Sequence, residues 1–162
     1  MLGAGTNRLY GYYLINPATG ANNVVASLTN SSSAGFLSVS YTGATQSGQP
    51  VENNTGTTAA AQTLAVSVVD QGTGAWIIGC FMAWDGTGAN YAAGSNTTQR
   101  VANDGFPRFR AHDSNTATTI SQTYNWDTGN DSASMIVAEI AAVATTVIKD
   151  IIRSCGVIPR KR

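Results

Sequence analysis

The sequence predicts an all-β protein, an antiparallel β-sandwich or jelly roll with long polar loops. Short apolar runs repeat along the chain, several with the two-residue alternation of a half-buried strand. Clusters of Gly, Asn, Asp, Ser and Thr separate these runs, and such clusters form turns and loops. Many short strands between turn clusters, with little helical periodicity, are typical of a sandwich or jelly roll.

The first part of the chain predicts three strands and a long connection. Residues 9–15 are rich in aromatic and aliphatic side chains and end before Pro17, which cannot donate to a ladder. Residues 24–28 form a second short apolar run, and residues 36–42 alternate between apolar and polar side chains. Residues 43–61 are rich in Gln, Asn, Thr and Gly, so we expect an exposed connection there.

The rest of the chain predicts five more strands. They are expected at residues 63–69, 76–84, 108–112, 119–126 and 134–143. The run at 76–84 is apolar on both faces, which favours a central strand covered on both sides. The final run is apolar on both faces except for Glu139. Residues 89–107 contain few apolar side chains and are expected to form mostly loop.

The C-terminal segment changes character. Apolar residues recur at helical spacing at Val143, Val147, Ile148, Ile151 and Ile152. This pattern predicts a short helix that packs on the sandwich or on a neighbouring chain, although a continuation of the last strand also fits. We therefore divide the chain into a sandwich domain, residues 1–145, and a C-terminal extension, residues 146–162, with a solvated basic tail.

Composition and charge limit the location and the partners. The 162 residues suit one domain, and 43% hydrophobic residues are enough for a core. Charged residues make up only 11% and the formal net charge is zero, so no overall field attracts nucleic acid or an anionic membrane. No apolar run approaches the roughly 20 residues of a membrane span, and the N-terminus does not resemble a secretory signal. We expect a virion or extracellular particle surface.

The sequence offers little for catalysis. His112 is the only histidine, and no Gly-x-Ser-x-Gly elbow surrounds a serine. His112 and Asp113 would point to opposite faces of a strand, so a surface or edge-strand histidine is the favoured interpretation. Glycosidases need two carboxylates, but nothing in the spacing of the two glutamates, Glu52 and Glu139, brings them together. We therefore expect no enzyme activity.

No metal or other cofactor is expected. Asp70, Asp85, Asp127 and Asp131 lie in loops of the kind that calcium favours, but ordinary Asp-Gly turns explain them as well. No Asp-x-Asp-x-Asp-Gly loop and no Cys/His cluster is present. The two cysteines do not make a disulfide framework, and Cys80 is interpreted as a small buried apolar residue.

Two groups of side chains suggest binding surfaces. Trp84, Tyr91 and Trp126 lie at strand ends or in a loop beside Asn and Asp, where they would form a sugar platform; the competing interpretation is that the two tryptophans cap the ends of the core. The second group is Arg100, Arg108 and Arg110 with nearby phenylalanines. The zero net charge and the acids Asp104 and Asp113 at the edges of this group disfavour nucleic acid, and a salt-bridged subunit interface explains these arginines at least as well.

An ordered series of motifs resembles a known group of proteins. The motifs are Tyr-Tyr-Leu-Ile-Asn-Pro-Ala-Thr-Gly at 12–20, Val-Ser-Tyr-Thr-Gly-Ala at 39–44, Pro-Val at 50–51, Ala-Trp-Ile-Ile-Gly at 75–79, Thr-Gln-Arg at 98–100 and the run at 135–143. Over residues 8–143 the chain resembles an uncharacterised family of β-sandwich domains of bacteriophage and environmental viral sequences. The resemblance implies further strands before the first motif, so either more N-terminal residues or a neighbouring molecule would cover an otherwise open edge.

Three functional hypotheses follow from these observations. The first is a structural virion protein of a bacteriophage, a capsid decoration, head-surface or tail-associated protein that binds neighbouring subunits. The second is an extracellular carbohydrate-binding or adhesin module that uses a surface glycan. The third is a hydrolase, for which His112 would be the best candidate. No membrane and no specific nucleic acid is expected as a partner.

Overall fold

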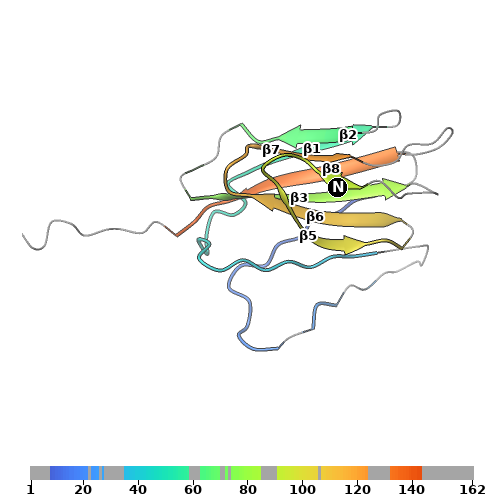
Figure 1. Ribbon diagram of the computed structural model, residues 1–162. Coiled ribbons are helices and arrows are strands. Elements are labelled where there is room, and N and C mark those ends of the chain that lie inside the picture. Colours follow the sequence, from blue (N-terminus) through green and yellow to red (C-terminus); the bar gives the residue numbers. More distant parts are fainter. Residues whose placement is uncertain are drawn as a thin grey trace, which may run out of the picture.

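A computed structural model shows an all-β protein (Figure 1). The structure describes residues 8–21, 23–25, 27, 35–58, 63–69, 72, 74–84, 91–105, 107–123 and 132–143. The strands are β1 (Glu52–Thr58), β2 (Thr63–Ser67), β3 (Trp76–Trp84), β4 (Ala92–Ala93), β5 (Thr98–Asn103), β6 (Arg108–Ser114), β7 (Thr119–Thr123) and β8 (Ser132–Ile140). Within these residues there is no helix, and therefore none that could cross a membrane.

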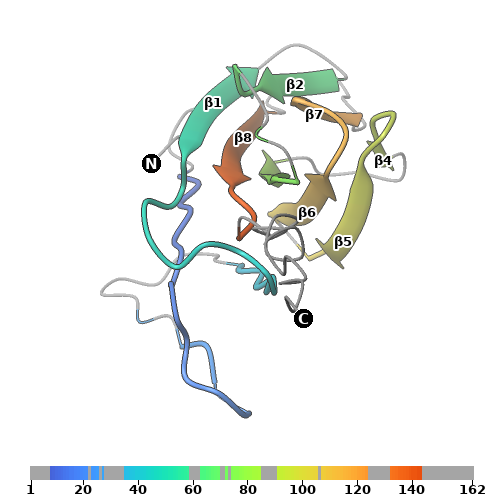
Figure 2. The same cartoon turned by 90° about the vertical axis from the view of Figure 1, so that its left-hand side faces the viewer.

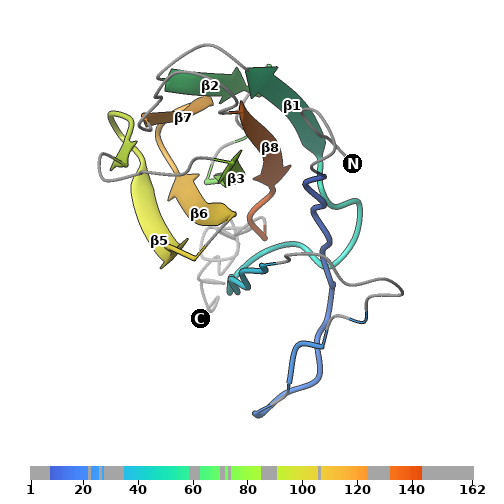
Figure 3. The same cartoon turned by 90° about the vertical axis from the view of Figure 1, so that its right-hand side faces the viewer.

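The strands form two antiparallel sheets that pack face to face, so the predicted β-sandwich is confirmed (Figure 3). One sheet has five strands in the order β1-β8-β3-β6-β5, and the other has three in the order β2-β7-β4. In an eight-stranded jelly roll, strands one, eight, three and six form one sheet, and strands two, seven, four and five form the other. The chain follows this order except that β5 pairs with β6.

The main core lies between the two sheets. It contains Leu64, Val66, Val68, Ile77, Phe81, Ala83, Ile120, Ala133, Met135 and Val137. We call the side of the five-stranded sheet that faces this core its inner face. The sheets approach closely at Gly79 on β3, where a Cβ atom would lie only 2.6 Å from Cγ2 of Ile120 on β7. A side chain at position 79 would therefore push the sheets apart.

The opposite side, the outer face, has its own smaller cluster. Met82 and Phe109 from the sheet pack with Leu9, and Leu37 and Ile136 are partly buried against them. Residues 35–43, which we call the cover segment, cross this face in an extended conformation. Their side chains alternate between partly buried and exposed. Both faces of the central strand β3 are therefore covered, as its apolar sequence predicts.

The N-terminal residues 10–25, which we call the arm, begin beside the five-stranded sheet, where Gly11 lies close to Ile136 of β8, and then lead away from the two sheets (Figure 2). Large apolar side chains of the arm are exposed, among them Tyr12 at 89%, Leu14 at 77% and Val25 at 78%. The sequence from residue 9 to residue 51 contains no charged residue. The arm is thus a neutral, largely apolar surface on an otherwise compact sandwich.

The prediction of strands at 9–15, 24–28 and 36–42 is wrong: the described residues of these three ranges form no strand. Residues 36–42 have the predicted alternation of buried and exposed side chains, and residues 9–15 have a single bridge at Leu9, but neither run joins a ladder. A strand exists only where a neighbour accepts and donates its backbone hydrogen bonds. Apolar sequence alone could not reveal that these runs have no such neighbour in the described chain.

Two predicted loops contain strands. The connection predicted at 43–61 contains β1, and the loop predicted at 89–107 contains β4 and β5. Both β1 and β5 are mostly exposed and polar, so they lack the apolar alternation by which a strand is recognised. The predictions at 63–69, 76–84, 108–112, 119–126 and 134–143 are confirmed by β2, β3, β6, β7 and β8, with shifts at their ends. The predicted C-terminal helix lies outside the described residues, apart from Val143.

Candidate functional site

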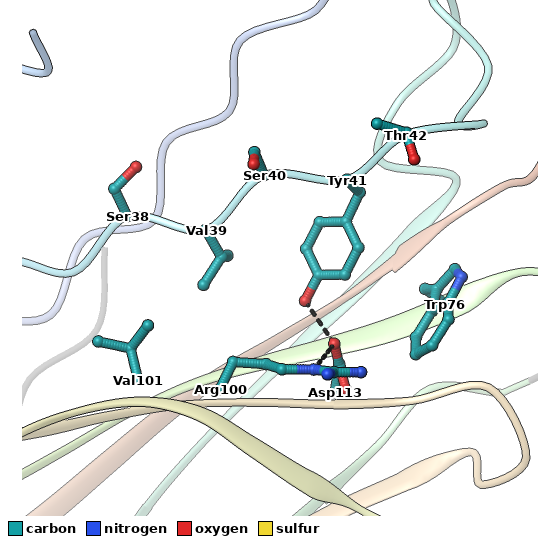
Figure 4. Close-up of a pocket in the computed structure, with 9 residues that line it drawn as sticks. All are labelled: Ser38, Val39, Ser40, Tyr41, Thr42, Trp76, Arg100, Val101 and Asp113. Atoms are coloured by element: carbon teal, nitrogen blue, oxygen red, sulfur yellow. Dashed lines mark hydrogen bonds and ion pairs between the residues drawn. The ribbon is translucent and has the colours of Figure 1, made fainter. Parts of the chain in front are cut away.

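A buried carboxylate stands on the outer face of the five-stranded sheet (Figure 4). Asp113 lies near the end of β6 and is 1% exposed. Its Oδ2 atom accepts a hydrogen bond from the Tyr41 hydroxyl at 2.9 Å and another from Nε of Arg100 at 2.7 Å. The cover segment, β5 and β6 therefore meet at one carboxylate oxygen.

Arg100 faces the outer side of the sheet by ordinary strand alternation, because Gln99 before it pairs with the inward-facing His112; a bulge follows at this point. The register with β6 shifts between Gln99 and Val101, which leaves Arg100 as the extra residue. A bulge re-aims a side chain, and here Arg100 and Val101 both lie on the outer face (Figure 4). The guanidinium carbon of Arg100 lies 5.7 Å from the ring centre of Trp76, which makes a cation–π contact as well as the ion pair.

These side chains border a cavity of about 400 Å³ between the cover segment and the sheet. It is lined by Ser38, Val39, Ser40, Tyr41, Thr42, Trp76, Arg100, Val101 and Asp113. Figure 4 shows Val39 and Tyr41 pointing toward the sheet and Ser38 and Ser40 pointing away from it. The rings of Tyr41 and Trp76 lie 6.0 Å apart and tilted, so the cavity has an aromatic wall.

The electrostatics of the cluster favour a fixed structural contact. Burial, together with the hydrogen bond to Asp113, raises the pKa of the Tyr41 hydroxyl far above its usual value, so it stays a neutral donor. The hydrogen bond to Asp113 raises the pKa of Arg100. Because a buried charge needs partners, the ion pair and the phenol hold Asp113 in place. In return, Asp113 holds the cover segment on the sheet.

The inner face of β6 carries a second set of polar side chains. Arg110 is 4% exposed, its guanidinium lies 4.3 Å from the ring centre of Tyr91, and it forms an ion pair with Asp104. His112 is 1% exposed, and neither ring nitrogen has a hydrogen-bond partner among the described residues. Burial, and then the nearby Arg110 charge, lower the pKa of His112 to about 4. The imidazole is therefore neutral at physiological pH.

The prediction of a surface or edge-strand histidine is wrong. β6 lies between β3 and β5, so it is not an edge strand. His112 is cross-strand neighbour to Gly79 of β3, on the face that packs against the other sheet. The alternation of the strand does separate His112 from Asp113, as predicted: Asp113 belongs to the outer face.

The three arginines predicted as a subunit interface do not form one surface. Arg100 lies on the outer face, whereas Arg108 and Arg110 project from the inner side of β6 next to Tyr91. Arg100 pairs with Asp113 and Arg110 with Asp104, both within the same chain. Their part in a subunit interface stays a prediction.

The predicted sugar platform is described only at Tyr91. Its ring packs edge-on against Phe81, with centres 6.3 Å apart, and Arg110 lies over it. A sugar needs an open ring face, which this packing does not favour. The side chain of Trp84 and the whole of Trp126 lie outside the described residues, as do Val147, Ile148, Ile151 and Ile152 of the predicted interface.

The two glutamates, which nothing in the sequence brings together, are cross-strand neighbours. Glu52 on β1 lies opposite Glu139 on β8. The Glu52 carboxylate accepts a hydrogen bond from the backbone N–H of Val69 at 2.9 Å, and the Glu139 carboxylate accepts one from Gly72 at 2.9 Å. Both carboxylates are thus bound by the segment between β2 and β3, which supports a structural role.

Other predictions about chemistry meet the structure only in part. No group of three or more His, Cys, Asp or Glu side chains that could hold a metal ion occurs within the described residues. The loop aspartates Asp70, Asp85, Asp127 and Asp131 lie outside them. Cys80 is a free, partly buried thiol, and burial raises its pKa, in accordance with its interpretation as a small apolar residue.

Sequence reasoning missed the contact between Tyr41 and Asp113. The alternation over 36–42 does indicate that Tyr41 faces inward, and a single aspartate within an otherwise buried strand signals a need for partners. Nothing in the sequence joins the two residues, which are 72 positions apart.

Comparisons with known proteins give no further guide to the site. A scan against protein-family models finds no match, and searches of the curated proteins and of the solved structures find none either. The resemblance of the strand motifs to a viral family therefore stays a prediction.

Proposed function

We propose that the protein is a structural virion protein of a bacteriophage that binds neighbouring subunits, as a capsid decoration, head-surface or tail-associated protein. The exposed apolar arm is the observation that carries this proposal. Monomeric soluble proteins rarely expose contiguous apolar surface of more than a few hundred Å². Here Tyr12, Tyr13, Leu14, Val24 and Val25 are each more than 60% exposed. A protein that works inside an assembly would cover them with a neighbour.

The topology of the sheets adds support of a more general kind. Jelly rolls are common in viral capsid proteins, but they also occur in lectins and cupins. Because a fold alone does not define a function, the strand order supports the viral proposal only together with the arm. The zero net charge and the low content of charged residues also suit a subunit that packs against others at close range.

The position of the only histidine supports a role without catalysis. A general base must reach its substrate and have a pKa near the working pH. His112 is 1% exposed, and its pKa is lowered to about 4. The third hypothesis, a hydrolase that uses His112, therefore loses its best candidate residue.

The proposal is tested on particles of the virus whose genome encodes the chain. Quantitative mass spectrometry of gradient-purified particles should find the protein in a fixed ratio to the major capsid protein. Immunogold labelling should then place it on the head or the tail. Presence in the infected-cell lysate together with absence from purified particles would contradict the proposal.

A further inference from the structure

We propose that the arm is a self-association surface, and that its partner is the arm of a second copy of this chain. The inference rests on the proposed assembly function, for which it names one partner and the contact. It starts from the side chains that the fold leaves uncovered. These are Tyr10 at 51%, Tyr12 at 89%, Tyr13 at 62%, Leu14 at 77%, Ile15 at 44%, Val24 at 67% and Val25 at 78% exposed.

The first part of the arm has the composition of a β-strand but pairs with no neighbouring strand among the described residues. Residues 10–15 are aromatic or aliphatic except for Gly11, and such residues are enriched in strands. In the described chain, residues 10–15 are not assigned to a strand. Residues 10–15 are fixed on either side instead: Leu9 before them is buried among Met82 and Phe109, and the backbone N–H of Asn16 after them donates to the side chain of Gln46. The apolar side chains from Tyr12 onward are thereby held exposed, although the backbone at Gly11 lies close to Ile136 of β8.

The size of this surface fits a dimer. Three partly exposed tyrosines and four aliphatic side chains amount to apolar area on the order of 800 Å². A standard protein interface buries about that much from each partner. Two arms that cover one another therefore supply a complete interface without help from the sheets.

The charge pattern favours a second copy over other partners. No charged residue lies between Arg8 and Glu52, so two arms meet without like-charge repulsion. A contact about a two-fold axis uses the same patch on both subunits, and a neutral apolar patch is complementary to itself. An anionic membrane would be bound through basic residues, and the arm contains none. The rings of Tyr10 and Tyr12 stack on each other, with centres 6.3 Å apart, and both side chains remain exposed.

The experiment measures the mass of the purified full chain in solution by sedimentation velocity over a range of concentrations. The wild-type chain should form a dimer. The double variant Tyr12→Ser/Leu14→Ser should raise the dimer dissociation constant by at least about tenfold. The matched control is Val69→Ser, which also removes an exposed apolar side chain, 90% exposed, but outside the arm. It should leave the constant unchanged.

A cysteine scan of residues 10–15 tests the symmetry of the contact. Where the same residue of two copies meets about a two-fold axis, a single cysteine should form an intermolecular disulfide in high yield, whereas Val69→Cys should not. Thermal unfolding of each variant checks that the sandwich is intact; only variants with the wild-type unfolding temperature are compared.

Three results would overturn the inference. They are a wild-type chain that stays monomeric at every concentration, a dimer that the arm variant does not weaken, and a monomer that binds neutral phosphatidylcholine vesicles through the arm. The proposed function fails separately. Absence of the protein from purified particles would contradict the proposed function, but an arm-dependent dimer in solution would still support the self-association. A chain that is monomeric in solution but present in purified particles would contradict only the dimer.

Discussion

His112 stays uncharged in the folded chain at neutral pH. Its pKa is lowered to about 4, first by burial and then by the neighbouring Arg110 charge. The unfolded chain would bind a proton on this residue at its usual pKa of about 6.5. Between these two values the unfolded state binds more protons than the folded state, so acid favours unfolding.

We therefore expect the free energy of unfolding to fall as the pH is lowered from about 6.5 to about 4. A difference of about 2.5 pKa units corresponds to a loss of up to about 3 kcal/mol. Urea unfolding at a series of pH values measures this loss of unfolding free energy, and the variant His112→Leu is the comparison. Because His112 is the only histidine, the variant should lose this part of the pH dependence. Equal slopes for the two proteins over this range would contradict the lowered pKa.

Tyr41 is the second residue with a predictable effect. Replacing it by phenylalanine removes the hydroxyl that donates to Asp113 and keeps the aromatic wall beside Trp76. A buried carboxylate that loses one partner destabilises the fold, here by about 1–2 kcal/mol. Chemical denaturation of Tyr41→Phe measures the change. Ser40→Ala is the matched control, because Ser40 points away from the sheet (Figure 4), and it should be neutral; equal stability of both variants would rule out a stabilising role for the hydroxyl.

At the scale of elements, β3 and β7 of the two sheets approach each other closely at Gly79. Gly79 permits it because Ile120 fills the space that a Cβ atom would take. We expect Gly79→Ala to destabilise the protein by about 1–3 kcal/mol through overpacking. Thermal and urea unfolding measure this change.

Two further variants make the prediction about Gly79 specific. In an Ile120→Ala background the same substitution should cost much less, because the two sites are in contact and their effects are not additive. Gly11→Ala is the control, since a Cβ atom there would make only ordinary contacts with Ile136 at 3.7 Å. Equal costs of Gly79→Ala in both backgrounds would show that the contact does not limit the packing.

The elements also show how far sequence reasoning reaches. Apolar periodicity found β2, β3, β6, β7 and β8, because each buries at least one face in the core. It missed β1 and β5, whose residues are mostly exposed and whose place in the sheet is set by backbone pairing. The site depends on even less visible features. The β-bulge that places Val101 beside Arg100 on the outer face and the contact between Tyr41 and Asp113, which are 72 positions apart, are products of the tertiary fold.

At the scale of the whole molecule, a neutral arm projects from a jelly-roll-ordered sandwich, in a chain whose formal net charge is zero. At 0.1 M salt the interaction between exposed charges is largely screened beyond about 10 Å. Apolar contacts are not weakened in this way, and sulfate strengthens them. The proposed self-association should therefore change little when sodium chloride is raised and should become tighter in sodium sulfate. Sedimentation velocity in the two salts measures this. Dissociation in sodium chloride would point instead to a contact through the arginines of β5 and β6.

The cover segment closes the outer face in a different way from the sheet beneath it. Leu37, Val39 and Tyr41 hold residues 36–42 by side chains, and in the described chain backbone bonds to neighbouring segments begin only at Gly43 and Thr45. Amide exchange with solvent should accordingly be fast along this segment and slow along β3, although the two lie one above the other. Lifting of the segment would break the Tyr41–Asp113 hydrogen bond and the packing of Leu37, but no backbone bond of the sheet. The inner face of the five-stranded sheet should therefore become exposed only when the sandwich unfolds, whereas the outer face should become exposed when a few side-chain contacts are lost.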